Sequence, residues 1–300
     1  MSFENILVAI DGSKNSQIAA EYGFWIANKL DASVTGQHVV DPRLVDLFIE
    51  PEFAEELGMD VSVDTSERVC KALKKIGKVI LDRFESEAKH RNFDVKVNLS
   101  EGYIVEEILR YSQQFDLLVV GHRGRGDREL PAHALLGSVA ERIVLGSHLP
   151  VLIAVQPIDR IEEILVAFDG SEAAKGALLM AENFAKNVNL KLKAVVVSDD
   201  DTESGARAIA EQGEKCLREY WSQDVFSIQK GDVHQILLDR SESNNSLLVL
   251  GAYGFKSPAQ NVLGRTTTSV IRQTQKSVLV YRPAHPAKAQ KPTHSKAAAK

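Results

Sequence analysis

The chain repeats itself, and this internal repeat limits its fold more than any other feature. Residues 5–13 read NILVAIDGS, and residues 163–171 read EILVAFDGS. Seven of these nine positions are identical at an offset of 158. Because chance does not plausibly produce such a match, we interpret the 300 residues as two copies of one structural unit. A chain of this length accommodates two domains of ordinary size.

Short apolar runs alternate with amphipathic helical patterns in both copies. Strands buried on both faces read as continuous apolar runs, and a strand–helix alternation is typical of a doubly wound parallel sheet. The sequence therefore predicts an α/β fold of two tandem, Rossmann-like sheets, each with five parallel strands. We expect a first domain at residues 1–156, a second at 161–283, and a disordered tail rich in Ala, Lys and Pro at 284–300. The expected strands lie at residues 5–10, 32–40, 94–97, 117–120 and 150–155, and again at 163–168, 191–197, 225–228, 247–250 and 277–281.

The two copies differ in length between their first and fourth strands. Asp11 to Gly121 spans 110 positions and Asp169 to Gly251 spans 82, so the first copy carries 28 additional residues. We place the additional segment within residues 41–65. Its apolar side chains are unusual for a solvated linker, so we expect it to cover the site or to form a subunit contact.

Composition and charge argue against several functional classes. The net charge of −5 and the pI of about 5.9 do not suit a nucleic-acid-binding protein, which needs a basic face. No apolar run approaches the roughly 20 residues of a membrane-spanning helix, and the N-terminus lacks the pattern of a signal peptide. Cys70 and Cys216 have neither a CxxC partner nor metal-ligand spacing. We therefore expect a cytoplasmic protein with reduced cysteines and no membrane partner.

Each copy ends its first strand with Asp-Gly-Ser. Ligands of open parallel sheets bind at the carboxyl ends of strands, where the winding direction reverses. Asp11 or Asp169 could accept a hydrogen bond from a ribose hydroxyl there, or each could close its own turn before the glycine. Ser13 and Ser171 are expected to cap the helices that follow.

A glycine motif follows the fourth strand of each copy. In the second copy, Gly251 and Gly254 follow an apolar run, nine residues separate Gly254 from Gly264, and hydroxyl residues then open a helical pattern. Glycine lets the backbone approach a ligand closely, and the first turn of a helix offers free N–H groups to a phosphate. Two turns flanking a loop are the alternative. The corresponding residues of the first copy are Gly121, Gly124, Gly137 and Ser138.

Together, the Asp-Gly-Ser turn and the G-x2-G-x9-G-[ST] motif resemble the universal stress protein family. The whole chain apart from its tail resembles the tandem, two-domain form of that family. The resemblance implies a HUP-type nucleotide-binding fold that holds ATP or a related adenine nucleotide, with or without Mg²⁺. It implies that Asp11 and Asp169 bind the adenosine, that the backbone of Val39 and Val196 contacts the adenine, and that the glycine motifs surround ribose and phosphates. The candidate nucleotide-binding residues are Asp11, Gly12, Ser13, Val39, Gly121, Arg123, Gly124, Gly137 and Ser138 in the first copy, and Asp169, Gly170, Val196, Gly251, Gly254, Gly264, Arg265 and Thr266 in the second.

Both copies depart from the glycine motif of the family. In the first, twelve residues separate Gly124 from Gly137, and the insert adds two arginines that, with Arg123, could grip a polyphosphate or belong to a solvated loop. In the second, Arg265 replaces the small hydroxyl residue and could either pair with a phosphate or fill the site. Thr266 and its neighbour Thr267 could supply the lost hydroxyl. One site is therefore a candidate for degeneracy, and we favour the first as the intact one.

Three functions remain open. The first is a non-catalytic regulatory module that binds an adenine nucleotide and acts in the stress response through a regulatory protein partner. The second is a dimerisation or scaffold protein with closed sites, in which the last strands at 151–155 and 278–281 pair within one chain, as the resemblance implies. Slow ATP hydrolysis or phosphotransfer ranks last, because the sequence has no Walker lysine, no metal-ligand cluster and no G-x-S-x-G nucleophile. We expect either a monomer with paired domains or a homodimer.

Overall fold

A computed structural model of the chain describes residues 3–44, 63–124, 138–158, 161–198, 203–217, 224–252 and 263–282. Several predictions from the sequence lie outside these ranges. They are the tail at 284–300, most of the additional segment, the arginine-containing insert after Gly124, and two of the motif glycines, Gly137 and Gly254.

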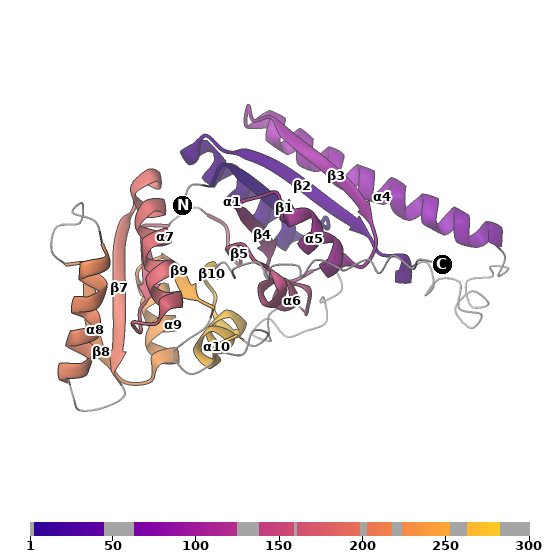
Figure 1. The fold of residues 1–300 in the computed structure, drawn as a ribbon. Coiled ribbons are helices and arrows are strands. Elements are labelled where there is room, and N and C mark those ends of the chain that lie inside the picture. Colours follow the sequence, from indigo (N-terminus) through magenta and orange to yellow (C-terminus); the bar gives the residue numbers. More distant parts are fainter. Residues whose placement is uncertain are drawn as a thin grey trace, which may run out of the picture.

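The described residues contain ten strands, which form one continuous sheet (Figure 1). The strand order is β3-β2-β1-β4-β5-β10-β9-β6-β7-β8, so each half is doubly wound about its own first strand. This confirms the predicted α/β class and shows that the two five-stranded sheets are joined edge to edge. The strands are β1 Asn5–Ala9, β2 Ser33–Val40, β3 Val95–Glu101, β4 Leu117–Gly121, β5 Val151–Ala154, β6 Glu163–Ala167, β7 Lys191–Ser198, β8 Phe226–Lys230, β9 Ser246–Gly251 and β10 Val278–Tyr281.

The two halves meet where β5 pairs with β10. This pairing is antiparallel, with Leu279 opposite Leu152, and the other strand pairs of the described sheet are parallel. The expected pairing of the last strands within one chain is therefore confirmed. Arg282 follows β10 and is 6% exposed; its guanidinium donates to the carbonyl of Val144 over 3.1 Å and also to that of Leu145 in the first half.

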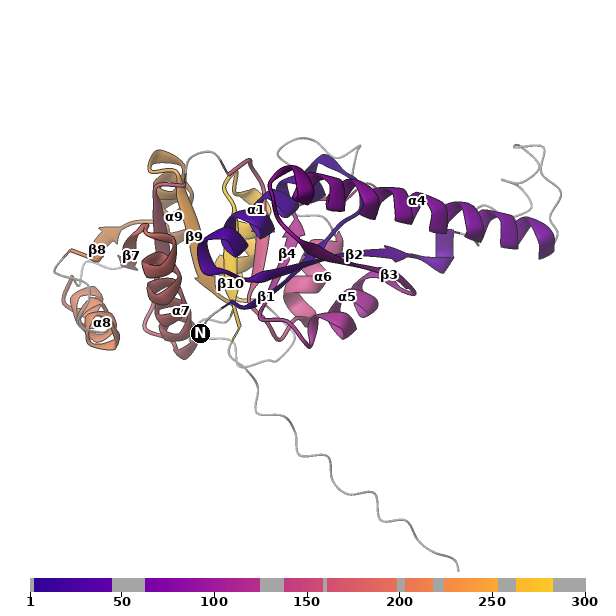
Figure 2. The ribbon, with the colours of Figure 1, turned by 90° about the horizontal axis from the view of Figure 1, so that it is seen from above.

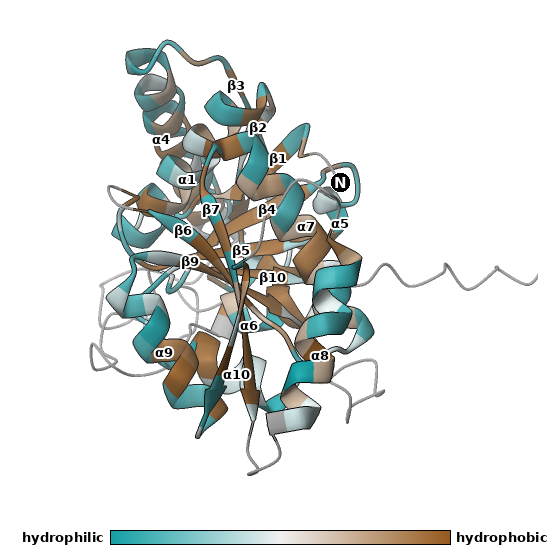
Figure 3. Cartoon of the chain, turned by 90° about the vertical axis from the view of Figure 1, so that its left-hand side faces the viewer, coloured by the Kyte–Doolittle hydropathy of each residue, from teal (hydrophilic) through white to brown (hydrophobic). Residues whose placement is uncertain are grey.

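Helices cover both faces of the sheet, and each face has its own hydrophobic core (Figure 2). Successive strand residues point to opposite faces; Val8 therefore packs in one core, and its neighbour Leu7 packs in the other. Figure 3 shows the mainly hydrophobic strands lying between helices whose polar residues face outward. One face carries α1 Lys14–Leu30, α4 Val63–His90, α7 Glu172–Val188 and α8 Glu203–Cys216; the other carries α5 Ile104–Ser112, α6 Ser138–Gly146, α9 Val233–Ser243 and α10 Arg265–Gln273.

The helices that follow the first strand of each half begin as the sequence predicts. The Ser13 hydroxyl accepts a hydrogen bond from the Ser16 backbone over 3.1 Å, and the Ser171 hydroxyl accepts one from Ala174 over 3.1 Å. Each serine satisfies an N–H group that the helix itself leaves unpaired. The helix starts are therefore fixed at the carboxyl ends of β1 and β6, beside the predicted site.

The helix α4 is much longer than the part of the sheet that it covers. It has 28 residues, and its N-terminal turns project beyond β2 and β3 in both views (Figures 1 and 2). Cys70 of α4 and Cys216 of α8 are both free thiols, as expected. Among the described helices, none combines the length and apolarity that a membrane crossing requires.

Candidate functional site

The carboxyl edge of the first half brings Asp11 and the glycine motif together. β1 and β4 are neighbouring parallel strands, so Asp11 and Gly124 follow strands that end side by side. A Cβ built on Gly124 would lie 3.3 Å from Oδ2 of Asp11. Any side chain at position 124 would therefore occupy the space in front of this carboxylate. The residue set fits a ligand that approaches the backbone closely and meets a carboxylate there.

Asp11 and Asp169 also close the turns in which they lie. Oδ1 of Asp11 accepts a hydrogen bond from the backbone N–H of Ser13 over 2.8 Å, and Asp169 accepts one from Ser171 over 2.9 Å. The intervening glycines have φ values of +76° and +79°, which other residues adopt only with strain. The turn-forming role considered for these aspartates is thus observed, and binding of ribose stays a prediction for the other oxygen.

The first glycine of each motif is packed against a helix. A Cβ built on Gly121 would lie 2.8 Å from the backbone carbon of Asn15 in α1, and one built on Gly251 would lie 2.8 Å from that of Ala173 in α7. The absence of a side chain at these two glycines therefore lets β4 pack closely against α1 and β9 against α7. In the first half, Asn15 also donates from Nδ2 to the carbonyl of Arg123 over 3.1 Å, which holds the start of the glycine loop.

Val39 and Val196, whose backbones contact the adenine according to the family resemblance, do not occupy equivalent positions in the two halves. The offset of 158 also relates the strand registers of the two halves, in which Val39 corresponds to Val197 and Val196 to His38. Val39 packs in the core beneath α5 and α6, and Val196 packs in the core beneath α7 and α8. Because a shift of one residue reverses the face of a strand, the two valines are not equivalent, and the contacts of their backbones with the adenine stay predictions. His38 is held at this edge by Nδ1, which lies 2.7 Å from the carbonyl oxygen of Ile10.

The second half uses its hydroxyl residues differently from the prediction. Gly264 caps α10, and its N–H donates to the carbonyl of Ala252 over 2.9 Å. The Thr267 hydroxyl donates to the carbonyl of Gly251 over 2.8 Å and is buried. Arg265 and Thr266 are exposed on the first turn of α10. Thr267 therefore ties the helix to the end of β9, and Thr266 is the threonine of this pair that faces solvent.

A cleft adjoins the Asp-Gly-Ser turn in the first half. It has a volume of about 350 Å³, runs between α1 and α4, and is lined by Gly12 and Ser16 together with the apolar side chains of Ile76 and Val79. In the second half, α8 packs against the corresponding turn. A Cβ built on Gly170 would lie 3.0 Å from Oε1 of Gln212 and 3.5 Å from Ile209.

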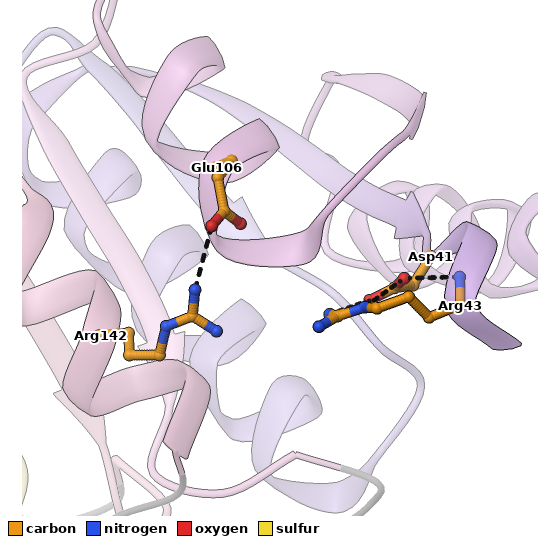
Figure 4. A network of polar contacts seen from close by, with 4 residues as sticks. All are labelled: Asp41, Arg43, Glu106 and Arg142. Carbon is orange, nitrogen blue, oxygen red and sulfur yellow. Dashed lines mark hydrogen bonds and ion pairs between the residues drawn. The ribbon is translucent and has the colours of Figure 1, made fainter.

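A charged network that sequence reasoning missed lies at the carboxyl end of β2 (Figure 4). Asp41 is buried and pairs with Arg43, while Glu106 of α5 pairs with Arg142 of α6 over 3.0 Å. The Arg43 guanidinium lowers the pKa of Asp41 by hydrogen bonding, and the same hydrogen bond raises the pKa of Arg43. The available signal was the position of Asp41 directly after a predicted strand. Ser138 is the first residue of α6, which carries Arg142 one turn later.

Two doubly wound halves with an Asp-Gly-Ser turn and a glycine motif at the carboxyl edge define a tandem α/β protein of the HUP-like class. The sequence profile described as "Universal stress protein family" matches residues 2–155 and again residues 160–282. The chain belongs to the universal stress protein family, in its tandem two-domain form.

Similar proteins come from bacteria and archaea. A universal stress protein of Synechocystis is 25% identical over 93% of this chain and all of its own length. One from Methanocaldococcus jannaschii is 30% identical over 52% of this chain and 84% of its own. The crystal structure of a universal stress protein from Archaeoglobus fulgidus superimposes with a TM-score of 0.70, covering 93% of this chain and 98% of that one. At 22% identity, this last similarity shows the shared fold.

Proposed function

We propose that this tandem universal stress protein is a non-catalytic regulatory module that binds ATP or a related adenine nucleotide in its first half. The observation that carries the proposal is the position of Gly124 next to Asp11, where a Cβ on the glycine would lie 3.3 Å from Oδ2 of the carboxylate. A carboxylate at this edge can accept a ribose hydroxyl, and a backbone without a side chain leaves room for the sugar. Family membership supports the same ligand, since the first half keeps the aspartate, glycines and serine of the family's nucleotide-binding motif, although twelve residues instead of nine separate Gly124 from Gly137.

Three features favour the first half over the second. The first half retains Ser138 at the start of α6, where the free N–H groups of the first helical turn suit a phosphate. The second half has Arg265 at this place, and Thr267 is already hydrogen-bonded to Gly251. Gly170 of the second half also packs against Gln212 of α8, whereas Gly12 lines a cleft.

Binding without catalysis is the simplest use of these residues. Within the ranges that the structure describes, no three His, Cys, Asp or Glu side chains come together as a metal site. Mg²⁺ is commonly held by one or two carboxylates together with substrate phosphates, so any bound Mg²⁺ would rely on the nucleotide. The protein would then signal through a change in its surface that a regulatory partner recognises.

Equilibrium dialysis of purified protein with ATP, AMP and a cyclic nucleotide tests the proposal. We expect binding of at least one of them, together with a ligand-dependent rise in melting temperature. Asp11→Asn should abolish most of the binding, because it preserves the Oδ1 acceptor of the turn and replaces the oxygen that faces Gly124 with an NH2 group. Asp169→Asn is the matched control, because it makes the same change in the equivalent turn and should leave binding intact. Absence of binding at millimolar nucleotide would refute the proposal.

A scaffold role is the second candidate, and the joined sheet favours it. The β5–β10 pairing makes the two halves one ten-stranded unit, and α8 packs over the second turn. This role predicts that Gly124→Val, which would obstruct the space before Asp11, leaves the biological activity of the protein unchanged. Loss of that activity in a folded Gly124→Val variant would contradict it.

A further inference from the structure

Arg43 presents a flat guanidinium group that the protein holds in one orientation. Asp41 follows β2 directly and is 4% exposed. Its Oδ1 accepts hydrogen bonds from the backbone N–H of Arg43 over 3.0 Å and from Nε over 2.9 Å, and Oδ2 contacts Nε and Nη2. A guanidinium gripped along one edge by a carboxylate keeps its plane, because rotation would break several hydrogen bonds at once.

Tyr103 supports one face of this guanidinium. The Arg43 guanidinium carbon lies 5.0 Å from the centroid of the Tyr103 ring, within the range of a cation–π contact. Tyr103 is the residue directly before α5. The backbone N–H of its neighbour Gly102 donates to the carbonyl of Val40 at the end of β2 over 3.1 Å, which holds this segment beside β2. The Arg43 side chain nevertheless remains 57% exposed. The stacked pair therefore stands at the carboxyl edge of the first half with part of the guanidinium open to solvent.

The charges around Arg43 determine which kind of chemical group can bind to its exposed guanidinium. Asp41 neutralises Arg43 directly, and Glu106 adds a second negative charge that acts on Arg43 while pairing with Arg142 over 3.0 Å. The network of Figure 4 thus holds two cations and two carboxylates. A phosphate would be repelled by both carboxylates, so its net gain is small. An uncharged aromatic ring is not repelled by the carboxylates, and it is stabilised by stacking on the plane of the guanidinium group.

The second half has no counterpart of Tyr103. Gly102 and Gly231 lie in equivalent turns of the two halves. Gly102 follows β3 with a φ of +147°, and Gly231 follows β8 with a φ of +141°. Tyr103 follows the first of these glycines, whereas Asp232 follows the second and caps α9 through a hydrogen bond from the Gln235 N–H over 2.9 Å. The aromatic support is therefore specific to the half in which we place the nucleotide.

We propose that Arg43, fixed by Asp41 and Tyr103, stacks on the purine base of the nucleotide in the first half and makes its affinity depend on that base. This inference rests on the proposed function. Stacking of a base on a planar side chain is typically worth about 1–3 kcal/mol, or roughly 5- to 140-fold in affinity. Lysine keeps the charge of Arg43 but has no plane, so it separates stacking from electrostatics.

The test compares ATP with ribose 5-triphosphate, which lacks the base, by isothermal titration calorimetry on the full chain. We expect Arg43→Lys to weaken ATP binding about tenfold, in the lower part of the stacking range, and to leave ribose triphosphate binding within twofold. Arg142→Lys is the matched control, since it makes the same change in the other arginine of the network and should alter neither affinity. Circular dichroism and melting temperature establish that each variant is folded.

The possible results distinguish failure of the stacking role from failure of nucleotide binding. Equal weakening of both ligands by Arg43→Lys, or no weakening of either, overturns the stacking role while nucleotide binding stands. A wild-type protein that binds neither ligand overturns the proposed function and this inference together. A Tyr103→Ala variant gives an independent measurement, because it removes the support and should also reduce the preference for ATP over ribose triphosphate.

Discussion

Alanine substitutions at two glycines of α8 test how this helix packs over the second half. A Cβ built on Gly205 meets no atom within 4 Å, whereas one built on Gly213 would lie 2.3 Å from Phe226 Cζ and 2.9 Å from Phe168 Cε1. The rings of Phe168 and Phe226 pack edge to face with centroids 5.4 Å apart. Neither ring can therefore move away from a new methyl group without disturbing the other.

The two substitutions share one energetic term and differ in another. Replacing glycine by alanine in a helix contributes about 0.5–1 kcal/mol of stability at either position. Overpacking a filled core costs about 1–3 kcal/mol. We therefore expect Gly205→Ala to stabilise the protein by about 0.5–1 kcal/mol and Gly213→Ala to be less stable than Gly205→Ala by about 1–3 kcal/mol. Most of the propensity term cancels in that difference, which therefore measures mainly the packing.

Urea unfolding followed by circular dichroism measures both free energies. The denaturation midpoint should rise for Gly205→Ala and fall relative to it for Gly213→Ala, with similar m-values. Equal stabilisation by both substitutions would refute the reasoning, because it would show that α8 does not press Gly213 against the two rings. The inferred packing of Gln212 and Ile209 against Gly170 would then also be contradicted, since these residues lie on the same helix.

Four further predictions follow from single contacts. Asp41 has a lowered pKa in the folded state, so its contribution to stability is present above the ordinary value of 3.8 and is lost as the pH falls through the lowered pKa; Asp41→Asn should flatten the acid limb of a stability–pH curve. Ser171→Ala removes a helix cap and should cost about 1 kcal/mol in urea unfolding. Thr267→Val removes the hydrogen bond to Gly251 and should cost about 1 kcal/mol in the same assay, and a neutral result would contradict that contact. Gly121→Ala forces a methyl group against the backbone of α1 and should cost about 1–3 kcal/mol; a melting temperature equal to that of the wild type would show that the contact is looser.

Much of the candidate site could be predicted because its parts are local in sequence. The Asp-Gly-Ser turn needs a carboxylate, a residue tolerant of positive φ and a hydroxyl, and residues 11–13 and 169–171 supply them in order. The roles of Gly121 and Gly251 were harder to assign, because the atoms that approach them belong to helices more than 70 positions away in sequence. Sequence shows that a glycine permits close approach, and only the fold shows what approaches.

The unequal positions of Val39 and Val196 were hidden from the sequence for a similar reason. Both residues lie in a short apolar run near the end of a strand, Val39–Val40 in β2 and Ala194–Val197 in β7, and such a run gives no sign of its register. Register comes from the hydrogen-bonded partner strand, where a shift of one residue exchanges the faces. The Arg43–Tyr103 contact was missed for the related reason that 60 positions separate the two residues.

By itself, the sequence determined the repeat, the alternation of strands and helices, and the caps at Ser13 and Ser171, since each depends on neighbouring residues and their hydrogen bonds. The tertiary structure alone decided the antiparallel register in which β5 and β10 pair, the packing of α8 over Gly170, and the alignment of Arg43 on Tyr103 by Asp41. These features join residues that are distant along the chain. Their contacts depend on how packed elements are placed in space, and a local pattern carries no information about that placement.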